Sequence, residues 1–397
     1  MPMKHDQSFD PEELDGYRRK IDEIVPLIRA HADEAERNAR LSQEVAEAMA
    51  RAGLYRVAAP RSLGGGETHP FTQIGVIEQV ANADGSAGWN LMIGIETTGI
   101  LGSALAHERA EAIYADPLLI IAGALNPKGI AEATDGGYRV SGQWPFASGC
   151  HNCQYFWGQC IVQENGERVY DERGQAKVLE VVVPAADFEI VETWDVAGLR
   201  GSGSHDIAVH DLFVPADMTT GATRQRSAER GPLFRVPLYT RLAYNKVGVA
   251  TGIARAAIDH FRNLASAKTP RGSRSLLNER VDAQLAMANA EATLRSARAF
   301  VFEAVGELWE TVVAGDVPTS EQRAMVQLAC SHATSEAVNA VGHIHAAAGA
   351  SANFRDNPLE RCFRDVQVVR QQIMASPQWI RSAGRVLLGL DSDSFIL

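Results

Sequence analysis

The stretch Ser141-Gly142-Gln143-Trp144-Pro145-Phe146-Ala147-Ser148-Gly149-Cys150 lies between two segments that favour extended structure, at residues 137–140 and 154–162. A turn that follows a strand would bring its tryptophan, phenylalanine and serine together beside small residues. There a planar ring can approach the backbone, with a hydroxyl and a few N–H groups at its edge. The same pattern also fits an ordinary strand end with a buried tryptophan, so the rest of the chain has to decide.

Composition narrows the class of protein. The chain has 397 residues, of which 46% are hydrophobic and 22% are charged, the balance of a globular protein. A formal net charge of −11 argues against nucleic acid or an anionic membrane surface as a partner. No apolar segment resembles a secretory signal, and none reaches the roughly 18 residues of a membrane span. We therefore expect a cytoplasmic protein.

The cysteines do not predict a disulfide framework or a metal centre. They number five, an odd count, at positions 150, 153, 160, 330 and 362. Cys150 and Cys153 form a CxxC pair, but zinc usually needs four ligands and the sequence offers no second pair. Reduced, partly buried thiols and the absence of a metal site are the expectation.

Three kinds of residue pattern follow one another along the chain, and together they predict an α+β fold that is mostly α. Residues 11–52, 70–83 and 87–105 read as helices of an N-terminal helical layer. From residue 118, short apolar runs separated by turn signals predict a small antiparallel β-barrel or sandwich. Alanine-rich helices at 243–267, 279–314, 320–350 and 358–389 predict a C-terminal four-helix bundle. The expected domains are residues 1–117, 118–222 and 223–397.

The segment from Met218 to Pro237 is polar and basic. Its arginines are Arg224, Arg226, Arg230 and Arg235. It reads either as a solvated linker or as a mobile lid over the mouth of a pocket.

The chain resembles the acyl-CoA dehydrogenase superfamily over nearly its whole length. The glycine-rich loop Gly198-Leu199-Arg200-Gly201-Ser202-Gly203-Ser204, followed by a strand that ends at Pro215, looks like one family motif. Pro358-Leu359-Glu360-Arg361-Cys362-Phe363-Arg364-Asp365 looks like its C-terminal motif. The stretch from Trp144 to Ser148 stands where the family places a tryptophan and a hydroxyl residue against a flavin. These motifs are specific in combination, although each alone is weak.

The finer resemblance is to the flavin-dependent monooxygenases of that superfamily, similar to 4-hydroxyphenylacetate and indole-3-acetate hydroxylases. It is carried by Ala83-Asp84-Gly85-Ser86-Ala87-Gly88-Trp89, the turn around Ser148, and Ala347-Ala348-Gly349-Ala350-Ser351. The resemblance implies reduced FMN or FAD supplied by a separate flavin reductase, and a flavin C4a-hydroperoxide formed with O2. It also implies the transfer of one oxygen atom to an aromatic or indole-like substrate, and a homotetramer.

The resemblance also implies a set of site residues. The residues expected to contact the flavin are Trp144, Phe146, Ser148, Arg271, Gln284 and Gly349. Ser148 would bond near the flavin N5, and Arg271 would reach the flavin phosphate from a neighbouring subunit. The residues expected to line the substrate pocket are Trp89, Met92 and Asp356. Read without the resemblance, Ser148 is a turn-capping serine, and Arg271 and Gln284 are ordinary surface residues.

One departure concerns the acid/base. Many members of the monooxygenase branch carry a histidine shortly after the Arg-Asp pair, and spacing places Gln372 there. Glutamine hydrogen-bonds but does not exchange a proton near neutral pH. Ser148 and Gln372 are therefore the expected catalytic positions, and a base, if one is needed, comes from elsewhere. The alternatives are His151, His205, His343 and His345.

Two other functions stay open at this point. Asp356 falls where acyl-CoA dehydrogenases keep a catalytic carboxylate, so an FAD-bound dehydrogenase or a nitroalkane-type oxidase is the alternative enzyme. A helical scaffold that kept the fold and lost the site is the non-enzymatic alternative.

Overall fold

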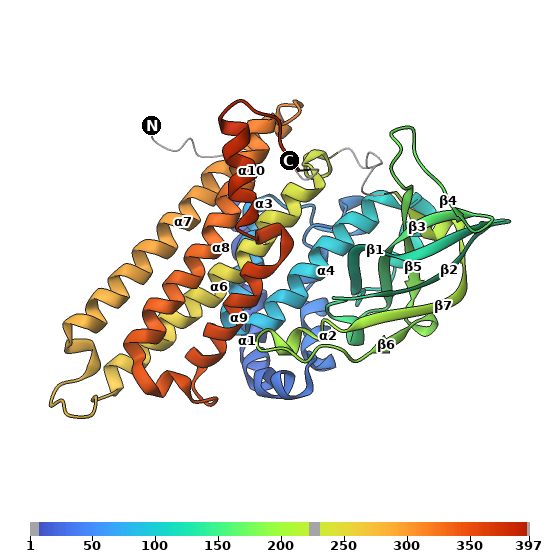
Figure 1. Cartoon of the computed structure of the whole chain (residues 1–397). Helices are drawn as coiled ribbons and strands as arrows, with labels where there is room; N and C mark the ends of the chain where they lie inside the picture. The colour runs from blue at the N-terminus through green and yellow to red at the C-terminus, as the bar shows by residue number, and fades with distance from the viewer. Residues whose placement is uncertain (1–7, 222–230, 395–397) are drawn as a thin grey trace.

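A computed structural model of the chain describes residues 8–221 and 231–394. The helical N-terminal part, the β-sheet and the C-terminal bundle follow one another as the sequence predicts (Figure 1). The expected architecture is therefore confirmed. The lid proposed within residues 218–237 has its centre, residues 222–230, outside the described residues. The domain limits at 117 and 222 stay a prediction.

The N-terminal part builds its helices with clear start signals. Asp10 accepts a hydrogen bond from the Glu12 amide and precedes Pro11, and Asp84 caps the next long helix through the Ala87 amide. The helices are α1 (Pro11–Asn38), α2 (Gln43–Arg51), α3 (Pro70–Ala83), α4 (Gly85–Ala104) and α5 (His107–Tyr114). Helix α4 is buried on nearly every side, because it lies between the bundle and the sheet (Figure 1).

The middle part is one sheet in the order β6-β7-β2-β1-β3-β5-β8, with β4 paired to β3. Its strands are β1 (Ile121–Thr134), β2 (Gly137–Trp144), β3 (Tyr155–Glu164), β4 (Glu167–Arg168), β5 (Val178–Pro184), β6 (Glu189–Val191), β7 (Asp206–Pro215) and β8 (Thr219–Thr220). The β1–β3 pair is parallel and the other pairs are antiparallel, so the sheet is mixed and the expected all-antiparallel pairing is refined. The cause is the turn at residues 145–154, which carries the chain past β1, so that β3 runs in the same direction as β1.

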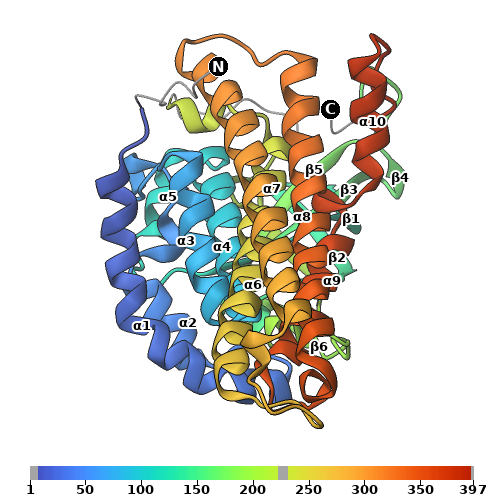
Figure 2. The same ribbon diagram turned by 90° about the vertical axis from the view of Figure 1, so that its left-hand side faces the viewer.

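The C-terminal part packs long helices beside one another. They are α6 (Leu238–Ala267), α7 (Val281–Val313), α8 (Ser320–Ala348), α9 (Pro358–Gln371) and α10 (Gln378–Leu387). In Figure 2 this bundle faces the viewer and the sheet lies behind it. The single helix expected over 358–389 is broken at residues 372–377, because Gln372 leaves helical geometry and Pro377 follows. The fourth helix of the bundle is therefore two pieces.

Within the described residues, no helix is long and apolar enough to cross a membrane. The same part of the chain holds no group of three or more histidine, cysteine, aspartate or glutamate side chains placed to bind a metal ion.

Candidate functional site

Ser148 sits in a chain of buried hydrogen bonds at the end of β2. Its hydroxyl accepts from the Trp89 indole N–H at 3.0 Å and lies 2.6 Å from the Ser204 hydroxyl. Ser204 in turn lies 2.8 Å from the Ser202 hydroxyl. The turn after β2 is thereby tied to α4 and to the glycine-rich loop. A hydroxyl has one proton and two lone pairs, so Ser148 can receive both Trp89 and Ser204 and still donate its own proton.

Two aromatic residues of the turn differ in burial. Trp144 is fully buried, and its N–H donates to the Gln159 carbonyl at 2.6 Å. Phe146 is 64% exposed and adopts a φ of 66°, which turns its ring outward. That ring meets the Trp194 ring edge-on, with centroids 6.2 Å apart. The open aromatic surface beside Ser148 therefore comes from Phe146 and Trp194, while Trp144 lies inside the sheet.

The two signature motifs contact each other. The Leu199 amide donates to Asp365 at 2.6 Å, and Arg364 donates to the Ala197 carbonyl. A Cβ on Gly198 would lie 2.5 Å from the Arg364 carbonyl oxygen, so only glycine allows this approach. The motifs thus join the sheet to α9 and hold the glycine-rich loop against the turn of Ser148.

A buried carboxylate stands at this joint. Burial, together with the bond from the Leu199 amide, which lowers the pKa, and the nearby carboxylates of Asp84 and Glu36, which raise it, brings the pKa of Asp365 to about 7. Burial likewise raises the pKa of Asp84, against the bond from the Ala87 amide and the charge of Arg361. The joint between the sheet and α9 therefore holds two buried carboxyl groups whose pKa values are raised.

Trp89 and Met92 belong to α4. Trp89 is buried and donates its N–H to the Ser148 hydroxyl. Met92 is fully buried, one turn further along the helix. Both side chains pack in the core between the sheet and the bundle.

A second group of expected residues gathers at one end of the bundle. Arg271, Gln284, Gly349 and Asp356 are all exposed there. They belong to the α6–α7 connection, the first turns of α7 and the α8–α9 connection, which lie at the same end (Figure 1). Lys268 links the two connections through bonds of 2.6 Å to the Ala348 carbonyl and to the Ser351 hydroxyl. In the single chain these residues face solvent.

The expected acid/base positions have local partners. The Gln372 side chain accepts from the Met374 amide at 2.6 Å and caps the break after α9. His205 accepts from the Trp194 amide at 3.1 Å, and its Nε2 lies 3.1 Å from the Ala39 carbonyl, which places the ring proton on Nε2. Burial and the neighbouring His205 lower the pKa of His151. Each of these side chains contacts neighbouring groups of the fold, and a catalytic role for any of them stays a prediction.

The remaining two histidines lie near the end of α8. His343 is exposed. His345 stacks on Phe363 with ring centroids 4.3 Å apart.

Several residues of the site were missed by the sequence reasoning. Ser202 and Ser204 stand in the glycine-rich motif but are not among the expected site residues, and neither is Trp194. Asn90 also bridges the Ser86 and Ser202 carbonyls, at 3.1 and 3.2 Å. Pairings across such sequence distances leave no local pattern.

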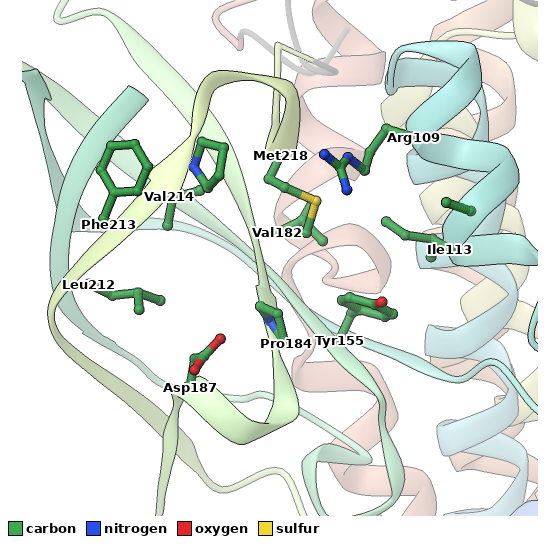
Figure 3. Close-up of a pocket in the computed structure, with 12 residues that line it drawn as sticks. Arg109, Ile113, Tyr155, Val182, Pro184, Asp187, Leu212, Phe213, Val214 and Met218 are labelled. Carbon is green, nitrogen blue, oxygen red and sulfur yellow. The ribbon is translucent and has the colours of Figure 1, made fainter. Parts of the chain in front are cut away.

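A hollow of about 290 Å³ opens elsewhere, between α5 and the sheet (Figure 3). Tyr155, Met218 and Arg109 are among its lining residues. It reaches Pro215, which pairs with Gly137 at the start of β2. Since Ser148 follows the other end of that strand, the hollow is separate from the turn of Ser148.

Comparison with known proteins gives matches along nearly the whole chain. The models "Acyl-CoA dehydrogenase, N-terminal domain" and "Acyl-CoA dehydrogenase, C-terminal domain" match residues 16–109 and 245–377. An indole-3-acetate monooxygenase of Pseudomonas putida is 33% identical, with 91% of this chain and 90% of the relative covered. One of Acinetobacter baumannii is 32% identical, with 91% of each chain covered.

Several solved structures share the fold, among them XiaF and a 3-HSA hydroxylase. XiaF of a Streptomyces species, in complex with FADH2 and glycerol, matches with a TM-score of 0.87 and 21% identity, covering 96% of this chain and 97% of that one. The 3-HSA hydroxylase of Rhodococcus sp. RHA1 matches with a TM-score of 0.85 and 22% identity, covering 96% and 98%.

Proposed function

This chain belongs to the acyl-CoA dehydrogenase superfamily and to its flavin-dependent monooxygenases, and from that premise we propose that it is the oxygenase component of a two-component system. It takes reduced FMN or FAD from a separate flavin reductase and uses O2 to hydroxylate an aromatic or indole-like small molecule. The relatives named as indole-3-acetate monooxygenases support that substrate class. We also propose a homotetramer that works in the cytoplasm.

The observation that carries the proposal is the exposed Phe146 ring beside the buried Trp89–Ser148–Ser204 chain. An exposed aromatic ring two residues from a fixed hydroxyl, with the Ser148 amide bonded to the Phe146 carbonyl at 2.9 Å, fits a planar ring that has polar atoms along one edge. The residues present thus fit a flavin: Phe146 and Trp194 would flank the ring, and Ser148 would meet its edge. A reduced flavin bound there supplies the electrons that activate O2.

The protein's own contribution is to fix one proton donor and to exclude water. Trp89 donates to the Ser148 oxygen, and the Ser148–Ser204 bond can take its proton from either hydroxyl; with Ser204 as the donor, the Ser148 proton is left free. The Ser148 proton is then directed at whatever acceptor lies at the Phe146 ring. Ser148 and Trp89 are themselves buried, and a ring bound over the exposed Phe146 would keep water from that proton.

The test supplies the protein with a flavin reductase, NADH, FMN or FAD, 18O2 and indole-3-acetate as the probe. We expect one labelled oxygen atom in the product, only when the reductase is present. We expect Ser148→Ala to lower the amount of product per NADH, and Ser148→Thr, which keeps the hydroxyl, to restore most of it. A protein that binds no reduced flavin under anaerobic conditions would contradict the proposal.

A further inference from the structure

A buried ion pair joins α4 to α6. The Lys246 ammonium lies 2.5 Å from the Glu96 carboxylate, and the side chains are only 2% and 5% exposed. Removing two charges from water is costly, and a well-packed apolar pair is often as stable. Stability alone therefore does not account for this pair, which calls for another role.

The pair lies on the helix face that begins at the proposed site. Glu96 follows Trp89 by seven residues, which is close to two full turns, so both side chains leave α4 on the same side. The two positions are about 10 Å apart along the helix axis. Met92 comes between them, and Trp89 holds Ser148 at the far end. One side of α4 thus runs from the turn of Ser148 to the buried charges.

Positive charge is in excess at this end of the face. Arg241, in the first turn of α6, also acts electrostatically on Glu96. Arg241 makes no ion pair with any residue in 8–221 or 231–394, and its Nε has no hydrogen-bond partner there. Two cations therefore share one carboxylate. Lys246 also keeps two further N–H donors beyond the one aimed at Glu96.

Polar atoms next to the ion pair also lack partners. In the part of the chain that the structure describes, neither Glu96 Oε1 nor Asn245 Oδ1 has a hydrogen-bond partner, although both residues are more than nine-tenths buried. Unsatisfied buried polar atoms are rare, because each one forfeits its bonds to water. Both of these oxygens are acceptors and call for a donor, whereas the cations beside them call for an anionic group: Arg241 has no ion-pair partner among the described residues, and Lys246 keeps two further N–H donors.

We propose that Lys246, with Arg241 beside it, determines specificity by binding the carboxylate of an aromatic acid whose ring points along α4 toward Ser148. The inference rests on the proposed function, which places oxidation of the ring at Ser148. Glu96 neutralises Lys246 when no substrate is bound and competes with the substrate carboxylate for it. The substrate class is therefore an aromatic ring with an acidic side arm.

The test compares two probes that share a ring: indole-3-acetate, and 3-methylindole, which lacks the carboxylate. Each is titrated calorimetrically into the wild-type protein, Lys246→Met and the control Lys20→Met, which changes an exposed lysine of α1. We expect the wild type and the control to bind the acid at least about tenfold more tightly than 3-methylindole. Lys246→Met should lose that preference. Its affinity for 3-methylindole should stay within about a factor of two of the wild-type value.

Glu96→Gln gives a prediction of opposite sign. It keeps the size of the side chain and removes the competing carboxylate, so acid binding should tighten by several-fold while 3-methylindole binding stays unchanged. Arg241→Gln, which leaves no partner unpaired, should weaken acid binding and covers the case in which Lys246→Met does not fold.

Three results would overturn the inference: no acid binding by the wild type, equal affinity for both probes, or weaker acid binding by Glu96→Gln. The titrations use neither flavin nor O2, so they report on Lys246 even if the proposed oxygenation fails. Conversely, labelled product from 3-methylindole without any preference for the acid would keep the proposed function and reject the role of Lys246.

Discussion

Trp89 is the single residue on which the orientation of Ser148 depends most directly. Trp89→Phe keeps an aromatic ring in the core but removes the N–H that donates to Ser148 at 3.0 Å. The loss of one buried hydrogen bond should lower the free energy of unfolding by about 1 kcal/mol. The Ser148 hydroxyl would then be held only by its bond to Ser204, so we expect less hydroxylated product per NADH and more hydrogen peroxide.

Trp309→Phe is the matched control, because the Trp309 N–H donates to the Ser8 hydroxyl at 2.7 Å, away from the turn. Denaturant unfolding should show a similar loss of stability in both variants, and product analysis should show uncoupling only for Trp89→Phe. Equal coupling in the two variants would remove Trp89 from the site.

Asp365 makes the stability of the chain depend on pH. Its pKa is raised from 3.8 to about 7, chiefly by burial. The protonated carboxyl is therefore the form that the fold favours. The stability it contributes is full below pH about 4 and is lost as the pH rises through about 7. Because a tenfold change in a proton-binding constant corresponds to about 1.4 kcal/mol, the loss amounts to a few kcal/mol at most.

Asp365→Asn tests this dependence, since the amide oxygen can still accept from the Leu199 amide while the charge is gone. In denaturant unfolding between pH 4 and 8, the free energy of unfolding of the variant should increase relative to that of the wild type as the pH rises. Parallel curves for the two proteins would show that Asp365 does not titrate in this window.

At the scale of elements, the contact between the glycine-rich loop and α9 decides how the sheet meets the bundle. In Gly198→Ala the new Cβ would lie 2.5 Å from the Arg364 carbonyl oxygen, and two backbones would have to separate. We expect a loss of about 1–3 kcal/mol in the free energy of unfolding. Gly342→Ala is the control. Gly342 lies within α8, and a Cβ added there would point into open space, with no neighbouring atom within 4 Å. That variant should be stabilised by about 0.5–1 kcal/mol. Equal effects would mean that the loop tolerates the displacement.

The order of elements could be read from the sequence because it rests on local patterns. Helical periodicity, turn residues and the small residues around Ser148 each act within a few positions. The break at Gln372 was missed, because the apolar pattern continues across it and only Pro377 signals the interruption. The parallel β1–β3 pair was missed as well, since antiparallel pairing is the ordinary expectation for strands separated by short turns.

The interior of the site was less accessible from the sequence. The ring of Phe146 faces outward because this residue has a positive φ. The residue type alone does not predict that backbone conformation. The Glu96–Lys246 pair joins positions 150 residues apart, and both are ordinary charged residues until burial is known. Local sequence patterns indicate where on the fold a site lies. Contacts between residues that are far apart in the sequence determine which side chains line it.

At the scale of the whole molecule, the expected flavin-binding residues fall into two groups. One surrounds Ser148, and the other, with Arg271 and Gln284, lies exposed at the end of the bundle (Figure 1). Large apolar side chains are exposed at the same end: Val281 is 69%, Leu285 58% and Phe354 64% exposed. Exposed apolar groups of this size are typical of surfaces that another chain covers. We therefore predict that a neighbouring subunit of a homotetramer packs on this end and brings Arg271 to the flavin of another chain.

Leu285→Arg tests that arrangement, because a cation in the middle of an apolar contact surface opposes association. Sedimentation should show smaller species than the wild type forms, and anaerobic titration should show weaker binding of reduced flavin in the same variant. Val317→Arg is the control, since Val317 is 86% exposed in the α7–α8 connection at the opposite end of α7, and both properties should stay unchanged. Loss of assembly with undiminished flavin binding would show that one chain holds the flavin alone. Assembly unaffected by Leu285→Arg would place the subunit contact elsewhere on the molecule.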